Sequence, residues 1–238
     1  ADGAHEPYRA VLRPLRERLK RTLLAIEAEL EGVEPPDLDM IERVDQLWDP
    51  LHACYQSMQN CGMNAIADGR LLDVLRLVKC FGMHLVRHDI RQDSARHTEV
   101  FEQLTPFLGL GSYADWDEPR RQSFLLEELA NPRPLIPANW QPSESVQEVL
   151  DTVAVVVKQP EEALGGYVIS MARQPSDVLS VMLLLKEFGC PFNLQVSPLF
   201  ETLDDLTRSR AVVESLLLRS VLLRMPCACR ADTPCTCT

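Results

Sequence analysis

Apolar residues recur at helical spacing through the first third of the chain. Between residues 7 and 31 this spacing predicts one long amphipathic helix, with its apolar stripe at Leu15, Leu19, Leu23, Ile26 and Leu30. The adjacent prolines in residues 31–39 cannot continue a helix, so a linker follows. Further helices are expected over residues 41–67 and 71–80. The first 80 residues therefore contain no predicted strand.

The pattern changes after residue 82, where short apolar runs begin to alternate with helical stretches. Such alternation indicates βα units with parallel strands. Ser176 is the expected N-cap of one helix, and Gly189 is expected just beyond its end. Strands are predicted over residues 85–90, 165–172 and 193–200, and helices over 94–108, 118–130, 143–158, 176–188 and 203–218.

These elements predict a strongly helix-rich α/β fold: a partial TIM-like (β/α) barrel of about three βα units, preceded by an all-helical segment. A complete (β/α)₈ barrel takes about 250 residues, so three units cannot close one. The expected organisation is a helical segment over 1–82, a partial barrel over 83–218 and a Cys-rich tail over 219–238 that is expected to be unstructured.

Composition and charge exclude several classes of function. A net charge of −11 and a pI near 4.9 argue against a nucleic-acid-binding surface, which needs a basic face. No apolar run is long enough for a transmembrane helix, and the first residues do not resemble a signal peptide. Four cysteines lie at scattered apolar positions, where reduced thiols are the rule, which favours the cytoplasm.

Candidate chemistry lies where the predicted strands end, because ligands of βα folds bind beyond the carboxyl ends of the strands. Arg91 follows the first predicted strand, Arg173 the second and Glu201 the third. Arginine grips phosphate or carboxylate with its planar fork, and a carboxylate suits Mg²⁺ or Mn²⁺. The alternative is that Arg91 and Glu201 are ordinary residues in surface ion pairs.

Long stretches of the chain resemble one enzyme family. The stretches LLDVLRLVKCFGMHLVRHDIRQDSARHTEVFEQLTPFLGLGSYADW, YVISMARQPSDVLSVMLLLKE and VSPLFETLDDL closely resemble bacterial phosphoenolpyruvate carboxylase. EPYRAVLRPLRERL and LWDPLHACYQSMQNCGM, which come earlier, fit the same family. The resemblance runs over about residues 6–216 and involves several long stretches in the family's order.

The resemblance implies an activity, a cofactor and partners. The family's enzymes carboxylate phosphoenolpyruvate with bicarbonate, giving oxaloacetate and phosphate, and they require Mg²⁺ or Mn²⁺. It implies that Arg91, in DIRQ, contacts the phosphorylated substrate as a catalytic residue, and that Glu201, in PLFETLDDL, binds the metal. Full-length members of the family are cytoplasmic homotetramers.

Other residues near these two are assigned smaller roles. Arg96 and His97 are expected on a solvated or ion-paired helix face, and His88 is expected to be structural. Arg173 is either a phosphate contact or a turn cation. The closely spaced cysteines of the tail could bind a soft metal, although zinc sites favour wider spacing; a shifted reading frame is the favoured explanation of Cys227, Cys229, Cys235 and Cys237.

The family's segments of the TAHPTE, SDSAKD and FHGRGG types do not occur in the chain. The chain is therefore expected to be an internal piece of a larger enzyme, with little activity alone because one carboxylate does not complete a metal site. The alternative is a non-catalytic helical interaction module, or a remnant of the enzyme, that binds through its helical first third.

Overall fold

The computed structural model describes residues 6–34 and 39–220, with side chains to residue 218. The chain divides into two compact units, Ala1–Val86 and Arg87–Thr238. Among the described residues, no helix combines the length and the apolar character needed to cross a bilayer.

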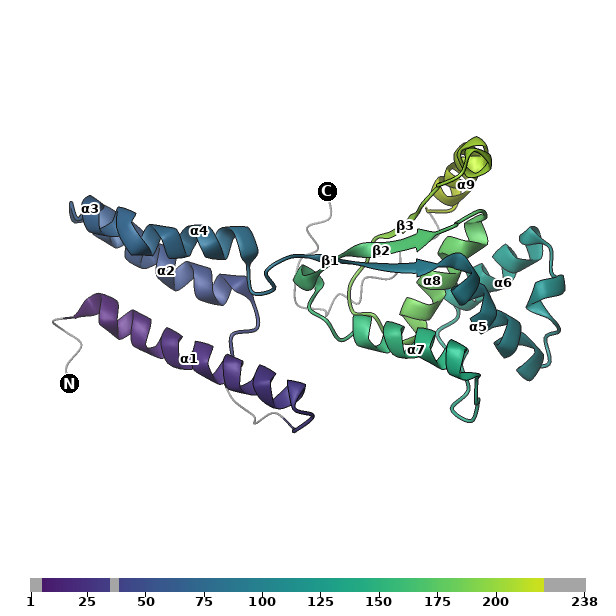
Figure 1. Ribbon diagram of the computed structural model, residues 1–238, viewed down its shortest axis with the longest axis horizontal. Helices are drawn as coiled ribbons and strands as arrows, with labels where there is room; N and C mark the ends of the chain where they lie inside the picture. Colours follow the sequence, from purple (N-terminus) through teal and green to yellow (C-terminus); the bar gives the residue numbers. More distant parts are fainter. Residues whose placement is uncertain (1–5, 35–38, 221–238) are drawn as a thin grey trace. The chain divides into compact units, whose positions relative to one another are not determined.

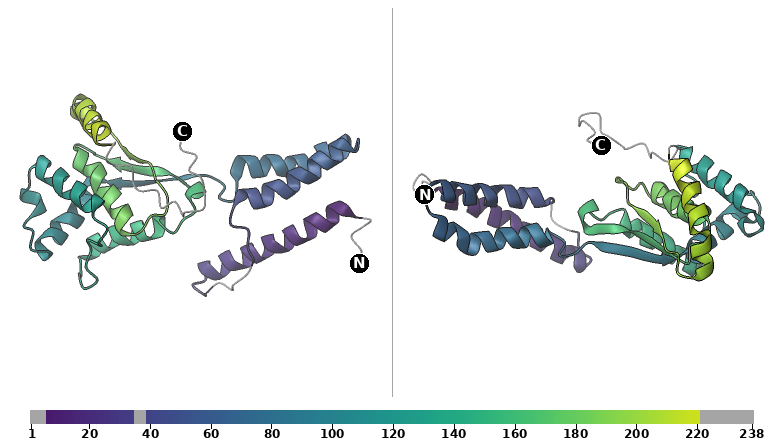
Figure 2. Two further views of the ribbon diagram at one scale, coloured as in Figure 1. Left: turned by 180° about the vertical axis from the view of Figure 1, so that it is seen from behind. Right: turned by 90° about the horizontal axis from the view of Figure 1, so that it is seen from above.

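The first unit consists of helices, and its long helices α1, α2 and α4 run back and forth, each antiparallel to the one before it (Figures 1 and 2). The expected long helix is confirmed as α1, whereas the helix expected over 41–67 ends early at Asn60. Gly62, two residues after Asn60, has φ +74°, a conformation that glycine adopts readily and that stops the helix. The elements are α1 (Pro7–Leu30), α2 (Val44–Asn60), α3 (Asn64–Ile66), the wide turn η2 (Ala67–Leu71) and α4 (Leu72–Phe81).

A small apolar core holds the helices of the first unit together. It has few members because only one stripe of each helix faces its neighbours. Its buried side chains are Leu15, Ile41, Leu47, Leu51, Leu75 and Val78.

The second unit is built on a three-stranded parallel sheet with the strand order β1-β2-β3. Its strands are β1 (His88–Asp93), β2 (Leu164–Ser170) and β3 (Val196–Pro198). Parallel pairing is thus confirmed, and the helix-rich α/β class with it. Its helices are α5 (Ser94–Phe107), η3 (Tyr113–Asp115), α6 (Glu118–Ala130), α7 (Glu144–Val156), η4 (Glu161–Ala163), α8 (Pro175–Glu187) and α9 (Leu203–Ser220).

Helices α5, α7 and α8 pack together on one side of the sheet (Figure 1). The sheet side chains that point toward them are apolar and include Ile90, Tyr167 and Ile169. Because strand side chains alternate, Arg91, Val168 and Ser197 lie together in register on the opposite face.

Most element boundaries differ from the sequence expectation by a few residues, and two of these differences have a clear local cause. The strand expected over 85–90 is wrong by three residues, because pairing with β2 begins at His88 and continues to Asp93. Helix α8 is capped by Gln174 rather than Ser176, since Pro175 takes the first helical position, where its missing N–H costs nothing. Gly189 has φ +70° just after α8, as expected.

Candidate active site

Arg91 lies inside strand β1. The sequence had suggested instead that it follows the strand. Its side chain is 72% exposed, and its Nη2 lies 3.7 Å from Asp89 Oδ2, two residues back on the same face of the sheet. An exposed ion pair of this kind contributes little to stability. The guanidinium of Arg91 is therefore available to another anion.

Asp89 owes its place to a glycine on the neighbouring strand. A Cβ at Gly165 would overlap Asp89 Oδ1, so any other residue at this position would displace that carboxylate from its place. The pairing register also shifts between His88 and Asp89, opposite this glycine. Sequence reasoning missed Asp89; the signal was the pair of adjacent glycines at the start of the second strand.

Glu201 follows β3 and is tied to the end of β2. Its Oε2 accepts a hydrogen bond from the backbone N–H of Met171, 3.3 Å away. Met171 has φ +53°, a left-handed conformation that is uncommon outside glycine, and its carbonyl accepts a hydrogen bond from Ser94 Oγ at 2.9 Å. The ends of all three strands are therefore joined at Met171, a residue that the sequence reasoning did not single out.

A capping box directly after Glu201 fixes the start of α9. The backbone N–H of Asp205 donates to Thr202 Oγ1 at 3.1 Å, and the backbone N–H of Thr202 donates to Asp205 Oδ2 at 3.2 Å. A hydrogen bond with the Thr202 side chain is the main cause of a lowered pKa of the Asp205 carboxyl group, and the hydrogen bond from the Thr202 backbone N–H lowers it as well. Glu201 is thus held between Met171 on one side and a capped helix on the other.

The two residues at the start of α5 differ from each other. Arg96 lies on an ion-paired helix face as expected: its Nη2 is 2.9 Å from Glu148 Oε2, and its Nη1 is 3.6 Å from Glu99 Oε2. His97 was expected on the same kind of face, and this is wrong because its side chain is fully buried. The residue that buries it, Tyr167, is 70 positions away in the sequence and shares a hydrogen bond with it.

Three further residues near the strands have simpler surroundings. His88 is exposed, and Arg173 is exposed with its backbone N–H donating to Asp177 Oδ2 at 2.8 Å. A phosphate contact and a turn cation both stay predictions for the Arg173 side chain. Arg87 Nε donates to the carbonyl of Leu164 at 3.0 Å, which ties the amino ends of β1 and β2 together.

The described residues fit a divalent cation only in part. Glu201 offers a carboxylate, the hard ligand that Mg²⁺ and Mn²⁺ prefer, and its Oε1 has no hydrogen bond within the described ranges. No group of three or more His, Cys, Asp or Glu side chains in the described part of the chain is close enough to hold a metal. The tail cysteines, Cys227, Cys229, Cys235 and Cys237, lie outside the described residues.

Comparisons with known proteins agree with the resemblance of the motifs. A sequence profile described as phosphoenolpyruvate carboxylase matches residues 1–230. The phosphoenolpyruvate carboxylase of Vibrio atlanticus is 55% identical over 217 residues, which cover 91% of this chain and 25% of the relative. That of Pectobacterium carotovorum is 56% identical over 213 residues, covering 89% and 24%.

The chain thus spans about a quarter of the length of the curated relatives that it matches. Since the family profile covers nearly all of its 238 residues, this chain belongs to the phosphoenolpyruvate carboxylase family.

Proposed function

We propose that the chain works as a part of a phosphoenolpyruvate carboxylase, which converts phosphoenolpyruvate and bicarbonate to oxaloacetate and phosphate. The observation that carries this proposal is that Arg91 lies on β1 and that Glu201, which follows β3, is hydrogen-bonded to Met171 just beyond the carboxyl end of β2 in the same small sheet. Arg91 is in register with Val168, and Met171 follows three residues later, so about 10 Å of strand separates Arg91 from the anchor of Glu201.

In this proposal Arg91 binds the phosphorylated substrate. A guanidinium is planar, always charged and suited to two parallel hydrogen bonds with phosphate oxygens. The ion pair with Asp89 restrains the guanidinium of Arg91 and leaves it exposed to solvent. Charge that develops on the phosphoryl group as its bond to the enol oxygen breaks would be stabilised by Arg91, a fixed cation at that edge.

Glu201 is proposed as one ligand of Mg²⁺ or Mn²⁺. Met171 occupies one oxygen of the carboxylate and leaves the other for the cation. A bound divalent cation supplies Lewis-acid stabilisation of an enolate oxygen. Because the described residues contain no group of three or more ligating side chains, the proposed site needs further ligands from the substrate, water or other protein segments.

The finer architecture is proposed on the same basis. Three parallel strands in sequential order, with helices of the connections on one side, are typical of part of a (β/α) barrel. We assign residues 83–218 to this partial barrel and 1–82 to a helical segment. The four described cysteines are free thiols, which supports a cytoplasmic location. Assembly into a homotetramer is carried over from the family.

The activity is tested by complementation. The purified chain is mixed with phosphoenolpyruvate, bicarbonate and Mg²⁺, with and without the segments of the Vibrio atlanticus enzyme that it does not match. We expect oxaloacetate only when those segments are added, and an Arg91→Ala chain should not support it. Absence of oxaloacetate in the complemented mixture, with both parts folded, would contradict the proposal.

A second candidate function, a helical interaction module, is favoured by one observation. Helix α1 leaves many of its large apolar side chains exposed, including Leu23, Ile26 and Leu30. Helices of single soluble domains usually bury such side chains. This surface can operate whether or not the chain takes part in catalysis.

A further inference from the structure

A short chain of hydrogen bonds joins the ends of the three strands through the backbone of Met171. Ser94, the first residue of α5 after β1, donates from its Oγ to the carbonyl of Met171 at 2.9 Å. Met171 directly follows β2, and its backbone N–H donates to Glu201 Oε2 at 3.3 Å. The hydroxyl of Ser94 and the carboxylate of Glu201 are therefore connected by one residue, although they lie in distant parts of the sequence.

The left-handed conformation of Met171 allows this residue to bond on both sides. In an extended strand the N–H and C=O of a residue point toward the same neighbouring strand. Met171 has φ +53°, and its N–H is directed to Glu201 beyond β3 while its C=O is directed to Ser94 beyond β1. A residue other than glycine adopts this conformation at a cost, so surrounding contacts must hold it in place.

The hydroxyl of Ser94 is presented from a fixed position. Asp93 caps α5 by accepting a hydrogen bond from the backbone N–H of Ala95 at 2.8 Å, which holds Ser94 in the first turn of the helix. On the other side, the residue after Met171, Ala172, is fully buried. Rotation of the Met171 carbonyl would therefore break its hydrogen bond with Ser94, because neither segment can easily follow the other.

We propose that Ser94 is a positioning residue for Glu201 and acts through the left-handed backbone of Met171. The hydrogen bond from Ser94 keeps the Met171 N–H aimed at Glu201 Oε2, and this N–H leaves Oε1 turned toward a divalent cation. A group that orients a metal-binding carboxylate raises its affinity, because the ligand is restrained before the cation binds. This inference rests on the proposed function, in which Glu201 is a ligand of Mg²⁺ or Mn²⁺.

The test measures Mn²⁺ binding to the full chain by the paramagnetic broadening of its backbone amide signals in NMR spectra. In the wild type, the amides of Met171 and Glu201 should broaden at lower Mn²⁺ concentration than those of the exposed acidic residues of α7. Ser94→Ala should need about tenfold more Mn²⁺ for the same broadening, because a partner that orients the ligand is lost. Ser94→Thr keeps the hydroxyl and should behave like the wild type.

Hydrogen exchange of the Met171 amide provides a readout that needs no metal. Ser94→Ala should speed this exchange several-fold, because the Met171 backbone is then free to turn its N–H away from Glu201. The amides of α8, which lie in the core of the unit, should exchange as slowly as in the wild type and so show that the variant is folded.

Two substitutions at Met171 test the role of its backbone conformation. Glycine adopts positive φ readily, whereas a β-branched residue with positive φ is rare. Met171→Gly should therefore keep Mn²⁺ binding near the wild-type level. Met171→Val should weaken it about as much as Ser94→Ala does.

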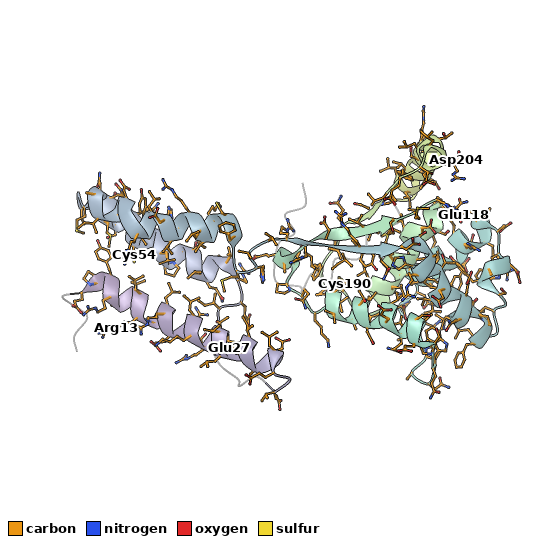
Figure 3. The ribbon with its side chains drawn as sticks, viewed as in Figure 1. Arg13, Glu27, Cys54, Glu118, Cys190 and Asp204 are labelled. Carbon is orange, nitrogen blue, oxygen red and sulfur yellow. The ribbon has the colours of Figure 1, made fainter. Side chains whose placement is uncertain are left out.

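Two control variants match the changes at Ser94 and Glu201. Ser170→Ala removes a hydroxyl that also joins β2 to β1, through the carbonyl of Gln92 at 3.5 Å. Asp204→Asn removes an exposed carboxylate from α9, where Figure 3 shows it. Both control variants should leave the broadening at Met171 unchanged.

The outcomes separate a failure of this inference from a failure of the proposed function. If Glu201→Gln weakens Mn²⁺ binding and Ser94→Ala does not, Glu201 is a ligand and the positioning role of Ser94 is overturned. If the wild type broadens no more strongly at Met171 and Glu201 than on α7, or if Glu201→Gln leaves the broadening unchanged, the ligand role of Glu201 is wrong and the inference fails with it.

Discussion

His97 Nε2 and Tyr167 OH lie 2.8 Å apart in the core of the second unit, where both side chains are fully buried. This hydrogen bond joins α5 to the central strand β2. His97 Nδ1 has no hydrogen-bond partner among the described residues. Only one of the two ring nitrogens is therefore hydrogen-bonded, and burial of the other costs free energy. The pKa of His97 is lowered from 6.5 to about 4, mainly because the ring is buried; the Asp93 carboxylate opposes this shift and the Arg96 guanidinium adds to it.

The stability of the protein should therefore fall in mild acid. In the unfolded chain His97 binds a proton as the pH falls through about 6.5, whereas in the folded chain it stays neutral until about pH 4. The unfolded state therefore binds more protons than the folded state between pH 6.5 and pH 4. The stability linked to the neutral His97 ring is present in full above pH 6.5 and is lost toward pH 4. We expect about 2 kcal/mol less stability at pH 5 than at pH 7 from this group.

Urea unfolding at the two pH values measures this loss, and His97→Gln provides the comparison. A neutral amide cannot take up the proton, so the variant should be less stable at pH 7 but should lose less stability between pH 7 and pH 5. Equal losses in the variant and the wild type would show that other groups cause the acid sensitivity.

Gly165→Ala should disturb β1 through Asp89. The new Cβ would overlap Asp89 Oδ1, which is the end of a flexible side chain that is 46% exposed, so the carboxylate can rotate away and the loss should stay below about 1 kcal/mol. Asp89→Ala removes the atoms that clash, so the double variant should recover most of the loss. Chemical denaturation of the two single variants and the double variant gives the coupling free energy between positions 165 and 89 directly. Additive effects in the double variant would mean that Gly165 is required for a reason other than Asp89.

Thr202→Ala should remove the capping box at the start of α9. Loss of an N-cap side chain costs about 1 kcal/mol, measured as a lower unfolding free energy at pH 7. Because Thr202 lowers the pKa of Asp205, the stability from this carboxylate is present at neutral pH and is lost as the pH falls through its lowered pKa. The difference between wild type and variant should therefore shrink in acid.

The control for the cap is Thr207→Ala on the same helix. Thr207 Oγ1 donates to the carbonyl of Leu203 at 2.9 Å, inside the helix and exposed to solvent. Its removal should change stability by less than about 0.5 kcal/mol. If Thr207→Ala lowered the unfolding free energy as much as Thr202→Ala, the capping position of Thr202 would add no stability beyond that of an ordinary threonine hydroxyl.

Arg91→Ala separates a functional role from a structural one. The side chain is 72% exposed, so its removal should change the unfolding free energy by less than about 0.5 kcal/mol. In the complemented enzyme the same change should lower activity by about 100-fold or more, because a fixed cation at the reacting phosphoryl group is lost. Arg210→Ala, which removes an even more exposed arginine (86%) from α9, should leave both quantities unchanged. Wild-type activity in Arg91→Ala would assign Arg91 to the surface.

Much of the fold was predictable from sequence because its signals are local. The stripe of α1, the glycine after α8 and the alternation of strands and helices depend on residues within a few positions of each other. The limits of β1 were not predictable, since a strand extends as far as its neighbour offers hydrogen bonds, and β2 offers them to Asp93.

For the candidate site, sequence by itself determined that Arg91 and Glu201 belong to the motifs of a known family. Only the tertiary structure decided what surrounds them. Asp89 beside Gly165, and Glu201 on the left-handed Met171, are contacts between segments 30 or more residues apart. The same holds for the burial of His97 under Tyr167. Local patterns record which residues can form a helix or strand, while contacts across the chain depend on packing and register, which no short stretch contains.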